Sequence, residues 1–273
     1  MIRIALLGDL HYPKIDKKED VLHEAAEYFY KNFLNEFLAV DADWHVSIGD
    51  LTHLGLEDEF REIYKLIESS QVKFQFALGN HDVLSLTKEN ILKLVKQPRY
   101  EAIETNECML LFLDTTKELQ LHGWGLDKEQ WDWLEIQISR SKDKPLLIFA
   151  HHPVPNTTKD SPTDHTEFEP LQDIRPLLDR REGLLLYFNG HTHTQSIVQK
   201  GNSHFIQTGA VLCDSNYMLI ELEDGEIIIY LHTIDDDQLG ASRDILYKKL
   251  KDYHRPQPNI QQDLKLVYHI VNE

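Results

Sequence analysis

A pattern that occurs five times between residues 2 and 193 constrains the fold of this 273-residue chain more than any other feature. In each case a short apolar run, typical of a buried strand, ends at a small residue and is followed by polar side chains. The runs are Ile2–Leu7, Trp44–Ile48, Val72–Leu78, Pro145–Ala150 and Leu184–Phe188. Because helical patterns alternate with these strands, we expect an α/β fold, in which ligand-binding residues gather at the carboxyl ends of the strands.

The helices are predicted from apolar residues that recur at helical spacing. They are Asp20–Ala39, Glu57–Glu68, Leu86–Val95, Lys128–Ser139 and Leu171–Asp179. Asp127 is expected to cap the fourth of these helices, because its side chain can accept a hydrogen bond from the first turn. The remaining predicted strands are Met109–Leu113, Ser203–Thr208, Tyr217–Leu222 and Ile227–His232, with a hairpin turn at Asp224-Gly225.

We expect residues 1–234 to form one domain and residues 235–273 to form a charged C-terminal extension. The extension begins with the amphipathic stretch Gln238–Tyr253, is interrupted by Pro256 and Pro258, and finishes with Leu264–Val271. Two placements stay open at this point. The extension can pack on the domain, or it can form a contact between copies of the chain in a homo-oligomer.

The net charge of −18 argues against sequence-independent nucleic-acid binding, which needs a broad basic surface. A chain with this net charge would also be repelled by anionic membranes. No apolar stretch reaches the roughly 18 residues of a membrane span, and the first apolar run meets Asp9 too early for a signal peptide. With only two cysteines, which exclude a disulfide framework, the expected location is the cytoplasm and no membrane partner is expected.

The polar clusters that follow the five strands contain donors for metal ions. They are Gly8-Asp9-Leu10-His11, Gly49-Asp50-Leu51-Thr52-His53, Gly79-Asn80-His81-Asp82, His151-His152-Pro153 and Gly190-His191-Thr192-His193. Each cluster alone is weak evidence, because an aspartate at a strand end is more often a turn former or a helix cap. Together they offer oxygen and imidazole donors without a thiolate, which suits Mn, Fe, Zn, Co or Ni. The donors outnumber the needs of one ion, so two ions that share a carboxylate are expected.

In their order and spacing these clusters resemble the calcineurin-like metallophosphoesterase superfamily. The motifs that carry the resemblance are D-x-H, G-D-x-x-H, G-N-H-D, H-x-P and G-H-x-H, between Ile4 and about His193. The resemblance implies a sandwich of two mixed β-sheets flanked by helices, with a site for two metal ions at the carboxyl ends of the strands. The motif style is similar to the cyclic-nucleotide phosphodiesterase and glycerophosphodiesterase branches.

The resemblance also implies a role for each motif residue. One ion would be held by Asp9, His11 and His193, the other by Asn80, His151 and His191, and Asp50 would bridge both. His81 would contact the phosphoryl group or protonate the leaving oxygen, and Asp82 would orient His81. The implied reaction is a direct attack on phosphorus by a hydroxide that bridges the two divalent or trivalent ions.

Two positions depart from the pattern or leave a choice. His53 stands where the phosphodiesterase branches often carry Asp or Asn, so it is given no ligand role. His151 is preferred over His152 as the ligand because of its position before x-Pro. The protein serine/threonine phosphatase branch, with G-D-x-x-D-R-G and G-N-H-E, is disfavoured.

The predicted activity is hydrolysis of a small phosphodiester, similar to a cyclic nucleotide. The alternatives are a phosphomonoesterase acting on a nucleotide or sugar phosphate, then a nuclease, which the net charge disfavours, and then a scaffold without catalysis. We expect Asn156–Glu169 to form the substrate loop, because functional loops are carried by rigid scaffolds. Histidines outside the motifs, among them His45, His204, His254 and His269, are assigned to the surface or the core.

Overall fold

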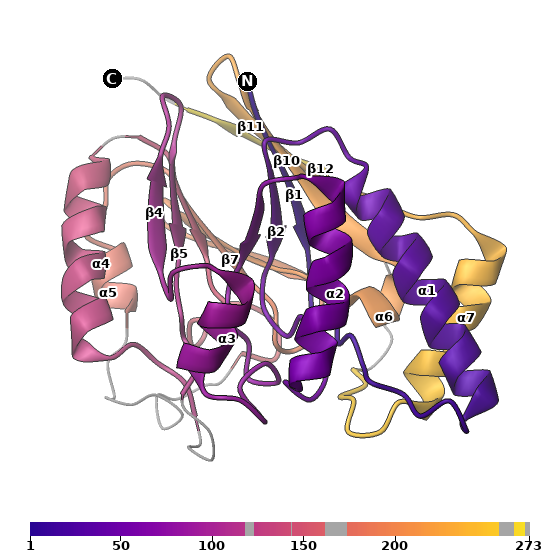
Figure 1. Cartoon of the computed structure of the whole chain (residues 1–273). Helices are drawn as coiled ribbons and strands as arrows, with labels where there is room; N and C mark the ends of the chain where they lie inside the picture. Colours follow the sequence, from indigo (N-terminus) through magenta and orange to yellow (C-terminus); the bar gives the residue numbers. More distant parts are fainter. Residues whose placement is uncertain (118–122, 143, 162–173, 257–264, 271–273) are drawn as a thin grey trace.

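The computed structural model describes residues 1–117, 123–142, 144–161, 174–256 and 265–270. Two six-stranded β-sheets pack against each other, and helices cover the outer face of each sheet (Figure 1). This arrangement confirms the predicted α/β class and the sandwich of two mixed sheets flanked by helices.

The first sheet has the order β12-β11-β10-β1-β2-β3. Its strands are β1 (Ile2–Leu7), β2 (Trp44–Ser47), β3 (Phe74–Phe76), β10 (Asn216–Glu223), β11 (Glu226–Thr233) and β12 (Lys265–His269). The first three strands are parallel to one another, and β10 joins β1 in antiparallel orientation. The carboxyl ends of β1, β2 and β3 therefore lie along one edge of this sheet.

The second sheet has the order β4-β5-β6-β7-β9-β8. Its strands are β4 (Glu101–Glu104), β5 (Met109–Phe112), β6 (Leu146–Phe149), β7 (Leu185–Asn189), β8 (Ser196–Lys200) and β9 (Ser203–Gln207). The four central strands are parallel, and the two edge strands are antiparallel to their neighbours.

Alternation along the central strands explains why both faces of each sheet are apolar. On β1, Ile4 and Leu6 lie in the core between the sheets, whereas Ala5 and Leu7 lie in the core under the helices. Successive side chains of a strand point to opposite faces, so a strand buried on both sides appears as one continuous apolar run. The short apolar runs of the sequence are therefore these central strands.

The helices form the two outer layers. The first sheet is covered by α1 (Asp20–Leu38), α2 (Glu57–Ser70) and α7 (Asp237–Lys249), and the second by α4 (Lys128–Ser141) and α5 (Arg175–Leu178). The remaining helices are α3 (Lys88–Val95) and α6 (Val211–Asp214). As predicted, Asp127 caps α4: its Oδ1 accepts a hydrogen bond from the backbone N–H of Gln130 at 2.9 Å.

Some elements were not predicted. The edge strands β4 and β8 are mostly half-buried, so they lack the continuous apolar run that marks a central strand.

In the C-terminal extension, α7 packs on α1 and β12 pairs with β11 in antiparallel register. The division at residue 234 and an oligomer contact remain predictions. Among the residues that the structure describes, no helix has the length and apolar content that crossing a membrane requires.

Candidate metal centre and active site

The loops that follow five parallel strands of the two sheets meet at one end of the sandwich. Hydrogen bonds that involve main-chain atoms join these loops across the sheets. The backbone N–H of His191, after β7, donates to Asp9 Oδ1, after β1, at 2.9 Å, and His151 Nδ1 donates to the carbonyl of Ile48 at 3.2 Å. Motifs far apart in the sequence are thereby held against one another.

Two glycines allow this close approach. At Gly49, whose φ is 108°, a Cβ atom would lie 2.6 Å from His151 Nδ1. At Gly190 a Cβ atom would lie 2.4 Å from Asp9 Oδ2. Contacts this short do not occur with a real side chain, so these two glycines leave the space that His151 and Asp9 occupy.

Four of the predicted ligands have a left-handed backbone. The φ angles are 51° at His11, 47° at Asp50, 73° at His191 and 59° at His193. A residue other than glycine adopts this conformation at a cost of order 1–3 kcal/mol, and such residues cluster at active sites and ligand sites. The strain indicates that the fold places these side chains for a purpose other than stability.

The first group of donors consists of Asp9, His11, Asp50 and His193. One ligand atom from each lies within 4.8 Å of the others, and all four residues are buried. His11 Nε2 is 2.9 Å from His193 Nε2 and 3.7 Å from Asp50 Oδ2. His193 Nε2 is 3.7 Å from Asp9 Oδ1.

The second group of donors surrounds Asn80. Its Oδ1 lies 3.0 Å from His151 Nε2 and 2.9 Å from His191 Nδ1. His151 Nε2 is also 3.3 Å from Asp50 Oδ2. Since the same oxygen of Asp50 lies between the two groups, its carboxylate is placed to serve both.

These distances fit metal ions. Donor atoms bound at about 2.0–2.2 Å to one ion are about 3–3.5 Å apart, which is close to most separations within the two groups. Asp9 Oδ2 is buried and has no hydrogen-bond partner among the described residues. A buried carboxylate oxygen without a partner is costly, so a cation at this place would satisfy it. Nitrogen and oxygen donors without a thiolate suit transition-metal ions.

The electrostatics of the centre follow from burial and from Asp50. Burial lowers the pKa of His191 to about 3 and the pKa of His11 well below its usual range. Burial opposes a charge on His151 as well, but the carboxylates of Asp50 and Asp9 raise its pKa to about 9. Burial likewise disfavours the charge on Asp50, yet His151 beside it holds the pKa of that carboxyl well below its usual range.

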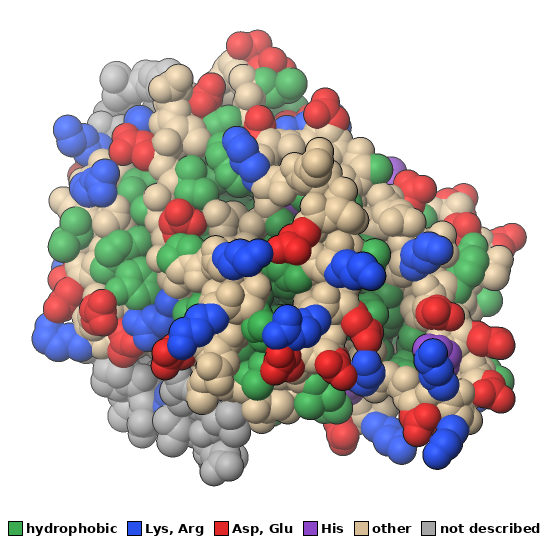
Figure 2. Space-filling view, viewed as in Figure 1, with side chains coloured by type: hydrophobic (Ala, Val, Ile, Leu, Met, Phe, Trp, Pro, Cys, Tyr) green, Lys and Arg blue, Asp and Glu red, His purple; other side chains and the backbone are tan. Residues whose placement is uncertain are grey.

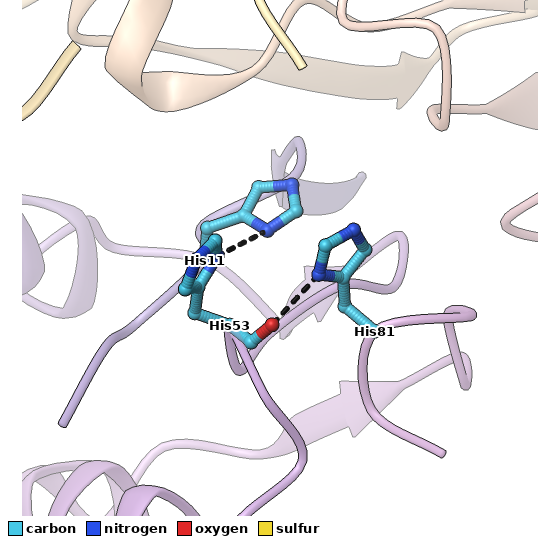
Figure 3. A group of neighbouring side chains, drawn as sticks. All are labelled: His11, His53 and His81. Carbon is cyan, nitrogen blue, oxygen red and sulfur yellow. Dashed lines mark hydrogen bonds between the residues drawn. The ribbon is translucent and has the colours of Figure 1, made fainter. Parts of the chain in front are cut away.

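His81 lies beside the two groups, and a neighbouring carbonyl orients it. Its Nδ1 donates to the backbone carbonyl of His53 at 2.7 Å (Figure 3), and its backbone N–H donates to Asp50 Oδ1 at 2.8 Å. The sequence predicted that Asp82 orients this ring, but in the structure the carbonyl of His53 is the hydrogen-bond partner of the ring.

Asp82 instead supports the loops beneath the site. Its carboxylate accepts hydrogen bonds from the backbone N–H groups of Gly79 and Thr52, both at 2.9 Å, and from Thr52 Oγ1 at 2.8 Å. Burial, with the charge of Asp50 second, raises the pKa of Asp82 to about 7. The side chain therefore ties the loop after β2 to the loop after β3.

The two adjacent histidines after β6 have different surroundings. The ring of His151 faces Asn80 and Asp50, as described above. His152 Nδ1 lies 2.8 Å from Thr115 Oγ1, and the His152 ring stacks on Trp124 with 4.8 Å between the ring centroids. The centroid of the His152 ring also lies 4.6 Å from that of the His191 ring, so His152 packs against one residue of the second group.

A cavity of about 850 Å³ opens over the centre. Besides the predicted residues Asp50, Asn80, His81, His191 and His193, it is lined by Trp124, Lys159, Asp160, Thr192, His254, Arg255 and Pro256. Lys159 and Asp160 belong to the predicted substrate loop, of which residues 162–169 lie outside the described residues. Trp124 and His254 were missed as site residues because neither belongs to a motif. The only local sequence feature that could have marked Trp124 as a site residue is the pair of glycines on either side of it, Gly123 and Gly125.

The fold and the donor groups define an α/β sandwich with a candidate metal centre at its strand ends. The Calcineurin-like phosphoesterase family matches residues 2–195. The chain is 24% identical over 171 residues to a 3',5'-cyclic-nucleotide phosphodiesterase of Nostoc sp., which is 63% of each chain. It is 28% identical over 158 residues to the glycerophosphodiester phosphodiesterase GpdQ of Enterobacter lignolyticus, covering 55% of this chain and 56% of that relative. In fold it is similar to the purple acid phosphatase PPD1 of yellow lupin seeds, with a TM-score of 0.60 and 14% identity over 85% of this chain and 51% of that one.

Because the match covers more than half of the sequence, the chain belongs to the calcineurin-like phosphoesterase family. It spans 63% and 56% of the length of the two curated relatives.

Proposed function

We propose that this protein hydrolyses a small phosphodiester, similar to a cyclic nucleotide, with two transition-metal ions. The observation that carries the proposal is that all seven predicted ligands converge in two groups that share Asp50, and that four of them, Asp50, Asn80, His191 and His193, line one cavity. The phosphodiesterase names of the two curated relatives support the same reaction class.

In this proposal each donor group holds one ion. Asp9, His11 and His193 form the first site, Asn80, His151 and His191 form the second, and Asp50 bridges the two. Two ions at this place would neutralise charge on the phosphoryl oxygens and activate the attacking water. The chain has to keep the six donors and the shared carboxylate in place, and the packing around Gly49 and Gly190 supports that task.

His81 is assigned to the chemistry. Its Nδ1–H is held by the carbonyl of His53, so Nε2 is the ring nitrogen left to act on a substrate in the cavity that this residue lines. From there Nε2 of the doubly protonated ring, which carries a hydrogen on each nitrogen, can protonate the leaving oxygen or donate to a phosphoryl oxygen. Asp82 acts indirectly, since it holds the loop that carries His81.

The cavity favours a small anionic substrate. Its volume lies within the range of about 300–1,000 Å³ that is usual for small-molecule sites. Lys159 and Arg255 at its wall bring positive charge to a chain whose net charge is −18. On the face seen in Figure 2, Lys and Arg are interspersed with Asp and Glu and form no continuous basic surface. The net charge of −18 disfavours a nuclease.

The test is a hydrolysis assay of the Mn²⁺-loaded protein on four substrates. They are 3',5'-cyclic AMP, bis-p-nitrophenyl phosphate, p-nitrophenyl phosphate and single-stranded DNA. We expect turnover of the two small diesters to exceed that of the monoester and of DNA, and Asp50→Asn to abolish it. A preference for p-nitrophenyl phosphate would support the phosphomonoesterase instead. No turnover of any substrate by protein that binds Mn²⁺ would contradict catalysis and favour the scaffold.

A further inference from the structure

Residues 250–256, which follow α7 and which we call the tail segment, lie against the metal centre although they fall outside the residues that match the family. Leu250 and Tyr253 are buried in the core that also contains α1. The guanidinium of Arg255 donates to the carbonyls of Leu250 at 2.6 Å and Tyr253 at 3.0 Å, and also to the carbonyl of Tyr247. The core packing of Leu250 and Tyr253 and the hydrogen bonds from Arg255 therefore hold the backbone of the tail segment in place.

Two main-chain carbonyls of the tail segment accept hydrogen bonds from histidines of the site. His193 Nδ1 donates to the carbonyl of His254 at 2.7 Å, and His53 Nε2 donates to the carbonyl of Lys251 at 2.7 Å. The ring of Tyr253 stacks on that of His193, with 4.8 Å between centroids and 22° between planes. Both histidines are nearly inaccessible to solvent, so water does not compete for these bonds.

These bonds decide which nitrogen of each ring carries the hydrogen. A carbonyl can only accept, and a neutral imidazole has one N–H and one lone pair. His53 therefore has its hydrogen on Nε2 and presents the lone pair of Nδ1 to His11 Nδ1, which is 3.4 Å away (Figure 3). If His11 Nδ1 supplies the hydrogen of that contact, the lone pair of His11 is on Nε2.

The same reasoning applies to His193. Its hydrogen is on Nδ1, so its lone pair is on Nε2. With the His11 hydrogen on Nδ1, the Nε2 atoms of His11 and His193 face each other at 2.9 Å with no hydrogen between them, whereas a hydrogen on His11 Nε2 would make the contact a hydrogen bond to His193. The same group also holds the carboxylates of Asp9 and Asp50. Two facing lone pairs repel each other, whereas a cation between them would be bound by both.

We infer that the tail segment positions the first metal site by setting the tautomers of His11 and His193, directly at His193 and through His53 at His11. The inference rests on the proposed ligand assignment of His11 and His193. His53 is accordingly a positioning residue and not a ligand. Partners of metal-binding histidines commonly fix the tautomer in this way, and their loss costs about 10–100-fold in metal affinity.

The experiment compares two full-length variants of almost equal shape, His53→Asn and His53→Leu. Only Asn offers an oxygen that can accept from His11 Nδ1. Mn²⁺ affinity is measured by titration, with the free ion followed by its electron paramagnetic resonance signal. The ring tautomers are measured in the metal-free protein by ¹⁵N chemical shifts of labelled histidine. His204→Leu, at a buried histidine whose ring contacts Tyr268, is the control.

We expect the hydrogen of His11 and of His193 on Nδ1 and that of His53 on Nε2 in the unchanged protein. His53→Leu should weaken the first site about 10–100-fold and displace the His11 hydrogen from Nδ1, while His53→Asn keeps both properties. Opposite tautomers in the unchanged protein, or equal effects of Leu and Asn, would overturn the inference. Both readouts are independent of catalysis, so they hold even if no phosphodiester is hydrolysed.

Discussion

Replacement of His81 by alanine tests whether this side chain takes part in the chemistry. If Nε2 of His81 protonates the leaving oxygen, its value depends on how strongly that oxygen needs a proton. General acid catalysis is worth about 10²–10⁴-fold, which is about 3–5 kcal/mol of activation free energy. A ribose alkoxide needs most of this help, whereas p-nitrophenolate leaves readily and needs little.

The structure indicates that the folded state tolerates this change. The ring of His81 is partly buried, and within the described part of the chain it makes one hydrogen bond, from Nδ1 to the carbonyl of His53 at 2.7 Å. Its loss should cost about 1 kcal/mol of unfolding free energy, against the roughly 5–15 kcal/mol that is usual for a folded protein. Because the assigned metal donors are other residues, His81→Ala should also keep its metal ions.

The assay compares kcat/KM of His81→Ala on 3',5'-cyclic AMP and on bis-p-nitrophenyl phosphate, with metal content measured in parallel. We expect a loss of about 10²–10⁴-fold on the cyclic nucleotide and a much smaller loss on the activated diester. His269→Ala, at an exposed histidine of β12, serves as the control. Equal losses on both substrates would refute proton donation and indicate that His81 stabilises charge on the phosphoryl oxygens. Loss of metal from the variant would refute both roles.

Three further predictions concern the metal site, the packing of its loops and the core. Asn80→Ala should weaken Mn²⁺ binding at the second site and leave the first unchanged, and equal binding of two ions by both proteins in a titration would contradict this ligand role. Gly190→Ala should lower the unfolding free energy by about 1–3 kcal/mol, since its Cβ would lie 2.4 Å from Asp9 Oδ2. The control Gly240→Ala in α7 meets no atom within 4 Å and should raise it by about 0.5–1 kcal/mol, and urea unfolding that shows equal effects would contradict the packing argument. Burial lowers the pKa of His45, so unfolding should take up a proton below about pH 6.5, and stability should fall by at most about 1.4 kcal/mol per pH unit as pH decreases. This slope should be shallower in His45→Leu, and identical slopes in urea unfolding at several pH values would exclude the effect.

The central layers of this fold could be predicted because their residues carry local signals. A strand buried on both faces is one apolar run, and an amphipathic helix repeats its apolar positions every three to four residues. The runs at β1, β2, β6 and β7 met this condition, and so did the pattern of α1. The edge strands β4 and β8 did not, because a half-buried edge resembles a loop in sequence.

The sequence by itself determined the donor types, their order and the strand end at which each stands. Those are properties of short segments, such as Asp9 and His11 after β1, and they sufficed to indicate a metal centre. The resemblance already implied that Asp50 serves both donor groups, but the tertiary structure alone decided that the carbonyl of His53 replaces Asp82 as the partner of His81. It also brought the tail segment to the site through the carbonyls of Lys251 and His254. Every residue has a main-chain carbonyl, so no side chain in the sequence distinguishes these two, and only the folded backbone gives them a role.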